Sequence, residues 1–204
     1  MNAEEVMGPG ADLAWADLSG RDLAGADLTG ADLSGANLAQ VTLAGAKLAG
    51  ANLSDSNLAG SDLSGAILTG TNLTNAKLTG ANLAGANLVG ANLTEVRADD
   101  VNLAAADLSG SNLKRAVLAG ADLSGGAILA DASLASADLT GANLTGADLT
   151  NALLRDADLT NANLSSANLD AALLANVMYS NTTCVDGTNS DDNGGTCSGL
   201  GAGS

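Results

Sequence analysis

The only two cysteines of the chain, Cys184 and Cys197, lie close together near its end. Metal ligation needs more donors than this, and the sequence has no histidine and no second thiol pair. A disulfide would close a short loop and stabilise the tail by about 3 kcal/mol, because it restricts the unfolded chain. We therefore predict a Cys184–Cys197 disulfide, which in turn indicates an oxidising compartment.

Oxygen-bearing side chains alternate within the segment that the cysteines enclose. Asn189, Asp191 and Asn193 occupy every second position and Gly194 follows, which resembles the first half of a calcium-binding loop. The pattern begins with Asn instead of Asp, and Leu200 stands where such loops place an acidic ligand. Calcium is therefore one interpretation of the tail. The alternative, which needs fewer assumptions, is that the disulfide holds the tail as a cap over the open end of the stacked repeats described below.

Carboxylates dominate the charge, because 23 Asp and Glu against seven Lys and Arg give a net charge of −16 at pH 7. Nucleic acid and anionic membranes are poor direct partners for such a chain. Acid–base catalysis needs buried or perturbed groups in a concave pocket, which exposed carboxylates do not supply. We expect no enzymatic activity and no catalytic or cofactor-binding residue. The first carboxylates should form an acidic collar, a possible interaction surface: Asp12, Asp17, Asp22, Asp27 and Asp32.

The spacing of these aspartates belongs to a five-residue repeat, Ala-(Asp or Asn)-Leu-x-x, which runs from Ala11 to Tyr179. On a helix, Leu at every fifth residue would turn by about 500° per repeat, so the leucines would not share a face. In an extended segment the Ala and Leu point to one side and the Asp or Asn to the other. The last two residues must turn the chain, and Gly often occupies the second. Each repeat is thus one wall and one corner, and repeats must stack to bury their apolar sides.

With these features the chain resembles the pentapeptide repeat family over residues 11–179. The resemblance implies an all-β fold, a right-handed quadrilateral β-helix with four repeats per coil. The central positions number 34 from Leu13 to Tyr179, so four repeats per coil would build about eight coils. A narrow interior of Leu and small residues accounts for the absence of Phe. The predicted core takes one leucine from each coil: Leu13, Leu33, Leu53, Leu73, Leu93, Leu113, Leu134 and Leu154.

The chain divides into three sections. Residues 1–10 form an N-terminal cap or leader, residues 11–179 the β-helix, and residues 180–204 a disulfide-closed tail. The first section lacks the basic start and apolar core of a signal peptide, so an extracytoplasmic location would require a processed form. A cytoplasmic location is the alternative. No apolar run is long enough for a membrane span.

Two irregularities interrupt the repeat. One extra residue in the segment around Gly125 and Gly126 predicts a bulge at a corner. Ala98 replaces a central leucine, which predicts a looser coil unless Leu78 and Leu118 above and below it close the gap.

A few outward positions are apolar. Leu153 and Leu173 would lie one above the other on the same wall if four repeats make a coil. Such a pair could seat the tail or a second subunit.

These features favour a non-enzymatic rigid scaffold, structural or protein-binding, with an unidentified protein partner and an undetermined oligomeric state. The alternative is an acidic DNA mimic acting on DNA gyrase, because relatives in this family that protect gyrase from quinolones present a duplex-like negative surface. The chain lacks their central phenylalanines, projecting loops and dimerising C-terminal helix. Its acidity is more simply explained by the solubility of a regular β-stack.

Overall fold

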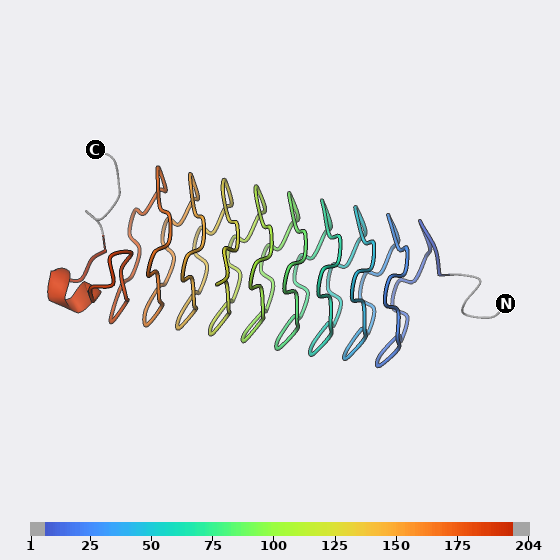
Figure 1. The fold of residues 1–204 in the computed structure, drawn as a ribbon. Coiled ribbons are helices and arrows are strands. Elements are labelled where there is room, and N and C mark those ends of the chain that lie inside the picture. Colours follow the sequence, from blue (N-terminus) through green and yellow to red (C-terminus); the bar gives the residue numbers. More distant parts are fainter. Residues whose placement is uncertain (1–6, 198–204) are drawn as a thin grey trace.

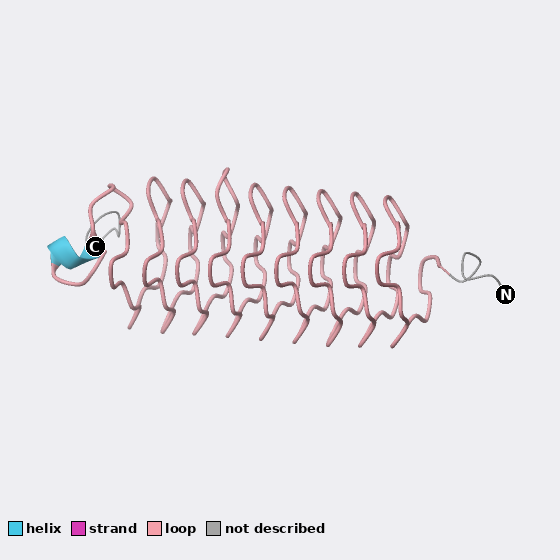
Figure 2. Ribbon diagram, turned by 90° about the horizontal axis from the view of Figure 1, so that it is seen from below, coloured by secondary structure: helices cyan, strands magenta, loops and turns pink. Residues whose placement is uncertain are grey.

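The computed structural model describes residues 7–197 as a rod of stacked coils, with the first described residues at one end of the rod and the last at the other (Figure 1). Each five-residue unit contributes one isolated parallel bridge, as between Asp12 and Asp32 and between Asp17 and Asn37. Bridged partners are four units apart, so every coil has four walls. The predicted right-handed quadrilateral β-helix is confirmed. Because each bridge is a single position, Figure 2 shows loops and one short helix.

We name the walls A to D in chain order. Wall A holds the outward positions from Asp12 to Leu173, wall B those from Asp17 to Met178, wall C those from Asp22 to Thr183, and wall D those from Asp27 to Asn168. Successive positions on a wall are one coil apart, or about 4.8 Å, which gives a rod about 40 Å long. No helix within residues 7–197 has the length and hydropathy that crossing a bilayer requires.

Leucine and small residues fill the interior of the rod. Leu33, Leu53 and Leu73 are fully buried, and Leu13 on the first coil is 9% exposed. The remaining predicted core residues are at most 2% exposed: Leu93, Leu113, Leu134 and Leu154. Backbone hydrogen bonds join each coil to the next. The N–H of a central leucine donates to a carbonyl of the following coil, and the N–H of an outward residue donates to a carbonyl of the preceding coil. The Leu33 N–H donates to the Asn52 carbonyl at 2.7 Å, for example.

The corners are turned by residues in the left-handed region. Asp55 and Asn75 have φ of 59° and 58°, a conformation that Asp and Asn tolerate better than most residues. The extra residue lies at a corner where Gly125 and Gly126 have φ of 68° and 81°. Asp107 consequently bridges Ile128, one residue further along than the usual partner. The next three bridges are longer by the same one residue, and the normal spacing resumes with Ile128 and Asp148. The insertion is a corner bulge that leaves the walls in register.

Deleting Gly126 should leave the rod intact, because the deletion restores the five-residue spacing between Leu123 and Leu129. We expect the melting temperature to change by less than about 2 °C. Deleting Gly141 instead leaves a four-residue unit and turns every later leucine away from the interior. That variant should melt at least about 10 °C lower, as measured by circular dichroism. Equal melting of the two variants would contradict the corner assignment.

The coil around Ala98 keeps its backbone ladder. The Leu78 N–H donates to the Arg97 carbonyl at 2.6 Å, and the Ala98 N–H donates to the Val117 carbonyl at 2.8 Å. Two buried valines, bulkier than the usual alanine, occupy the small inward positions on either side of Ala98: Val96 and Val101. Ala98 is itself only 1% exposed, so the coil stays closed to solvent where the leucine is missing.

The β-helix extends one unit beyond the predicted end at residue 179. Thr183 bridges Asn163 on wall C, and Cys184 takes the central inward position, where it is fully buried. The sequence pattern does not reveal this last unit, because Thr182 and Cys184 occupy the positions where the repeat has Ala and Leu. Tyr179, the preceding central residue, is 6% exposed.

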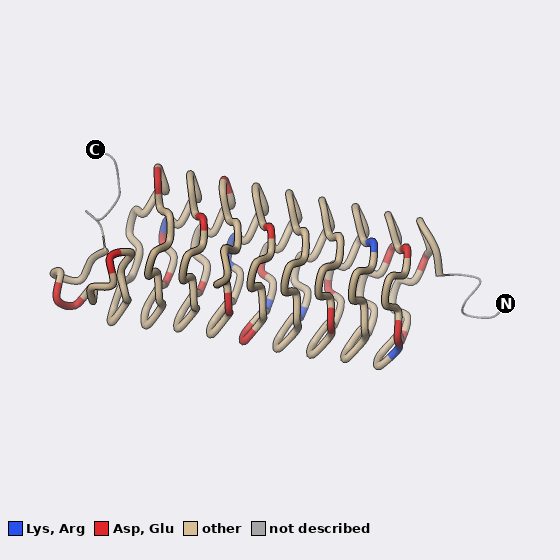
Figure 3. Tube along the Cα trace, in the orientation of Figure 1, with Lys and Arg blue, Asp and Glu red and all other residues tan. Residues whose placement is uncertain are grey.

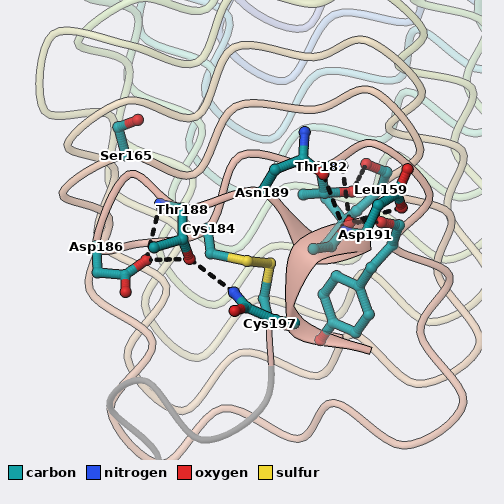
Figure 4. The surroundings of a disulfide bond; sticks show 12 residues. Leu159, Ser165, Thr182, Cys184, Asp186, Thr188, Asn189, Asp191 and Cys197 are labelled. Carbon is teal, nitrogen blue, oxygen red and sulfur yellow. Dashed lines mark hydrogen bonds between the residues drawn. A yellow bond between two sulfur atoms is a disulfide. The ribbon is translucent and has the colours of Figure 1, made fainter. Parts of the chain in front are cut away.

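After this last unit the chain folds back over the end of the rod (Figure 4). Asn189 pairs with Thr183 in the antiparallel direction, and the 3-10 helix η2 follows at Ser190–Asn193. Cys197 then closes the disulfide with Cys184, with 5.3 Å between their Cα atoms. The predicted disulfide is confirmed.

Candidate functional site

The acidic collar occupies the first coil and the start of the second. Asp12, Asp17, Asp22 and Asp27 lie on walls A to D in turn, and Asp32 follows Asp12 on wall A. Each carboxylate folds toward its own corner and accepts a hydrogen bond from the backbone N–H two residues later, as Asp12 does from Ala14 at 3.3 Å. The collar carboxylates therefore stabilise the corners as well as carrying negative charge.

Hydroxyl groups strengthen this arrangement. The Ser19 hydroxyl donates to Asp17 and the Thr29 hydroxyl to Asp27, each at 2.7 Å. These hydrogen bonds, followed by those from the backbone, hold the pKa of both carboxyls below the usual 3.8. Stability from a lowered carboxyl pKa is present above the unfolded value and is lost as the pH falls through the folded one. At neutral pH Asp17 and Asp27 are therefore ionised.

Amide ladders connect successive coils on walls A and C. The Asn52 amide donates to Asp32 at 3.2 Å, and the Asn72 amide donates to Asn52 at 3.0 Å. On wall C the Asn82 amide donates to Asp62 at 3.0 Å. Asn52, Asn72 and Asn82 each donate along the wall and accept from their own corner, so these side chains are used for the stack. Figure 3 shows the acidic positions spread along the rod, with few basic ones.

The three candidate calcium ligands are engaged within the tail. The Asn189 side-chain oxygen accepts from the Asp191 N–H at 2.9 Å and caps η2. Asp191 accepts from the Asn181 N–H at 2.9 Å, and the Asn193 amide donates to Thr188 at 2.7 Å (Figure 4). Within residues 7–197, no group of three or more acidic or thiol side chains is arranged to hold a metal ion.

Leu153 and Leu173 lie together near the C-terminal end of wall A. They bridge each other and are 40% and 55% exposed. With Lys114, Ala135 and Arg155 they line a hollow of about 230 Å³. A second hollow of about 360 Å³ shares Lys114 and Ala135 and continues along the corner between walls A and B. We call this surface the A/B groove; its full lining is Thr94, Lys114, Arg115, Ser133, Ala135, Ser136, Leu153, Arg155 and Leu173.

The A/B groove lies beside most of the positive charge of the chain. Five of the seven basic residues lie on wall B or at the A/B corner: Lys77, Arg97, Lys114, Arg115 and Arg155. Within residues 7–197 only Arg115 among them has an ion-pair partner, Glu95 at 3.0 Å. Lys77 and Arg97 bridge each other directly, an arrangement of like charges that costs stability.

This basic cluster was not predicted from the sequence, because its members come from different repeats. Counting by coils, with one residue added after Gly126, would have aligned Lys114 with Arg155. Within one segment the positive charge is also hard to recognise, because acidic residues surround Arg97 in the sequence.

The repeat and the four-walled coil define one class of protein. The family model described as pentapeptide repeats matches the chain in eight copies between residues 11 and 176. This chain belongs to the pentapeptide repeat family, as its leucine spacing predicted.

Two solved structures are similar to this chain. HetL, a pentapeptide repeat protein involved in heterocyst differentiation regulation from the cyanobacterium Nostoc sp. strain PCC 7120, is 37% identical over 89% of this chain and 86% of HetL, with a TM-score of 0.47. Trypsin-treated QnrB1, a plasmid-mediated fluoroquinolone resistance protein, is 18% identical over 78% of this chain and 82% of QnrB1, with a TM-score of 0.60. The likeness to QnrB1 shows the fold alone. The sequence has no match among curated proteins.

Proposed function

We propose that this protein is a non-enzymatic, rigid scaffold whose outer walls bind a protein partner. The observation that carries the proposal is the filled interior, where leucines such as Leu83 and Leu108 are fully buried from coil to coil. Chemistry on a substrate needs a concave site with convergent functional groups. The A/B groove is instead a shallow outer surface with an apolar floor and basic sides, which suits contact with another protein.

The charge distribution favours this function over DNA mimicry. Duplex DNA carries one negative charge per ~1.7 Å of its axis, so a mimic needs a long and continuous acidic surface. On wall A, neutral asparagines replace aspartate from Asn52 to Asn112. The A/B corner carries cations. We expect no inhibition of gyrase supercoiling and no protection from quinolones at micromolar protein, whereas either effect would favour the mimic.

We propose an extracytoplasmic location and a tail that is a disulfide-held cap. The disulfide supports both, because it joins the last central position, Cys184, to the end of the folded-back segment at Cys197. Protein taken from its source under alkylating conditions should show no modified thiol before reduction. Free thiols would indicate the cytoplasmic alternative. Millimolar calcium should leave the melting temperature unchanged, since the oxygens of Asn189 and Asp191 already accept hydrogen bonds.

Photo-crosslinking in the native cells tests the scaffold. A photoreactive residue is placed at one outward position on each wall, for example Asn72, Asn57, Asn102 and Asn87 on walls A to D. We expect positions facing the partner to crosslink reproducibly to one other protein, and positions on the opposite walls to give none. Crosslinks to no other protein from any wall would overturn the proposal.

A further inference from the structure

Trp15, the only tryptophan of the chain, lies on the outside of the first coil and is 78% exposed. It is the second residue of the first A/B corner, between Asp12 on wall A and Asp17 on wall B. Its ring lies against Gly35, the equivalent corner residue of the next coil, because a side chain added at Gly35 would overlap that ring. A large apolar group with carboxylates on both sides is therefore held on the surface of the rod.

The A/B groove, near the other end of the same corner, has the complementary chemistry. Leu153 and Leu173 offer an apolar floor, and Lys114 and Arg155 stand beside them without an ion-pair partner in residues 7–197. A buried indole gains most from aliphatic contacts, and carboxylates next to it would form charge-assisted hydrogen bonds with these cations. Trp15 and the A/B groove are therefore complementary, and they lie too far apart to meet within a single rod.

We propose that two copies of this chain pair along their A/B corners in antiparallel orientation, with Trp15 of each copy in the A/B groove of the other. Two-fold symmetry makes the contact twice and closes the assembly at a dimer. Antiparallel pairing also matches charge between the ends. Asp55 lies two coils after Trp15 on the same corner, and Lys114 lies three coils before Leu173, so these opposite charges come to similar levels.

A second copy fits this corner better than other occupants. A corner about 40 Å long and 15 to 20 Å wide would bury roughly 600 to 800 Å² per copy, close to the size of a stable interface. A polyanion such as nucleic acid would meet a chain with net charge −16 and would have no use for the leucine floor. An acidic segment of another protein would fill the groove but leave Trp15 in water.

Fluorescence of Trp15 tests the proposal with purified protein, independently of the partner sought in cells. Between submicromolar and high micromolar concentrations we expect the emission to shift to shorter wavelength while the sedimentation mass doubles. Replacing both groove leucines, Leu153→Asp with Leu173→Asp, should abolish both changes. The matched control is Ile128→Asp on wall D, which removes an outward apolar side chain of similar exposure, 38% against 40% for Leu153. This control should behave like the wild type.

A mixing experiment separates direct contact from a folding defect. Trp15→Ala lacks the anchor and the double Asp variant lacks the groove, so neither should dimerise alone. In the mixture, Trp15 of the double variant can enter the intact groove of the other chain. We expect its emission to shift, more weakly than in the wild type because one of the two contacts remains. A monomeric wild type at every concentration, or a dimer in which Trp15 emission never shifts, would overturn the proposal.

Discussion

Leu83→Ala should lose about 2 to 5 kcal/mol of the free energy of unfolding, the usual cost of removing a buried leucine side chain from a close-packed core. Leu83 is fully buried in the middle of the rod. Its inward neighbours in sequence, Ala81 and Ala86, are small, so neither has a side chain long enough to extend into the cavity. The natural Ala98 differs, because Val96 and Val101 flank it. Urea unfolding followed by circular dichroism measures the loss.

Ile67→Ala provides the matched control for this variant. Ile67 is an aliphatic residue of the same rod but lies at an outward position of wall D and is 41% exposed. Its truncation should cost less than about 1 kcal/mol, as expected for most surface substitutions. Comparable losses at Leu83 and Ile67 would contradict the assignment of inward and outward positions.

Removing the disulfide by the double change Cys184→Ala with Cys197→Ala should lower stability by about 3 kcal/mol, because the open tail gains entropy in the unfolded chain. The cap should also loosen over Tyr179, whose phenol is buried without a hydrogen-bond partner. Burial raises the pKa of Tyr179 to about 12. In the uncapped variant this pKa should move back toward about 10, as seen in a near-ultraviolet absorbance titration.

The sign of this effect follows from the protonation states. The folded protein keeps Tyr179 neutral, so its contribution to stability is complete below the unfolded pKa of about 10 and is lost as the pH rises toward 12. Oxidised protein is the control, and reduction of the wild type should reproduce the double variant. A phenol that titrates near 12 with and without the disulfide would show that the disulfide is not what holds the tail over Tyr179.

Most of the fold could be predicted from the sequence, because one physical pattern repeats in every unit. The leucine at every fifth position excludes a helix and places one leucine side chain inward per wall, beside the small inward residue. The extra residue at Gly125 and Gly126 was predictable as a bulge, since glycine accepts the corner conformation twice in succession. The end of the rod was not, because Thr182 and Cys184 fill inward positions without matching the repeat.

The candidate site was harder to predict than the fold. The stacking of Leu153 on Leu173 depends only on the coil length, so it could be expected from the spacing. The cations around them could not be found in one segment, because Lys114 and Arg155 meet only after the coil length and the corner bulge are both known. Trp15 was visible as a single aromatic residue, but its place at the A/B corner depends on the three-dimensional register.

Outer side chains can present a fixed surface to a partner only if the coils beneath them form a continuous rigid frame. Native-state hydrogen exchange read by NMR shows whether the frame is continuous, because it reports the opening of each backbone hydrogen bond. We predict uniformly slow exchange for the central amides from Leu33 to Leu164, including Ala98, with faster exchange only in the first and last coils. Fast exchange of the central amides around Ala98 or beside Gly126 would show that the rod opens locally there, which would contradict a continuous rigid frame.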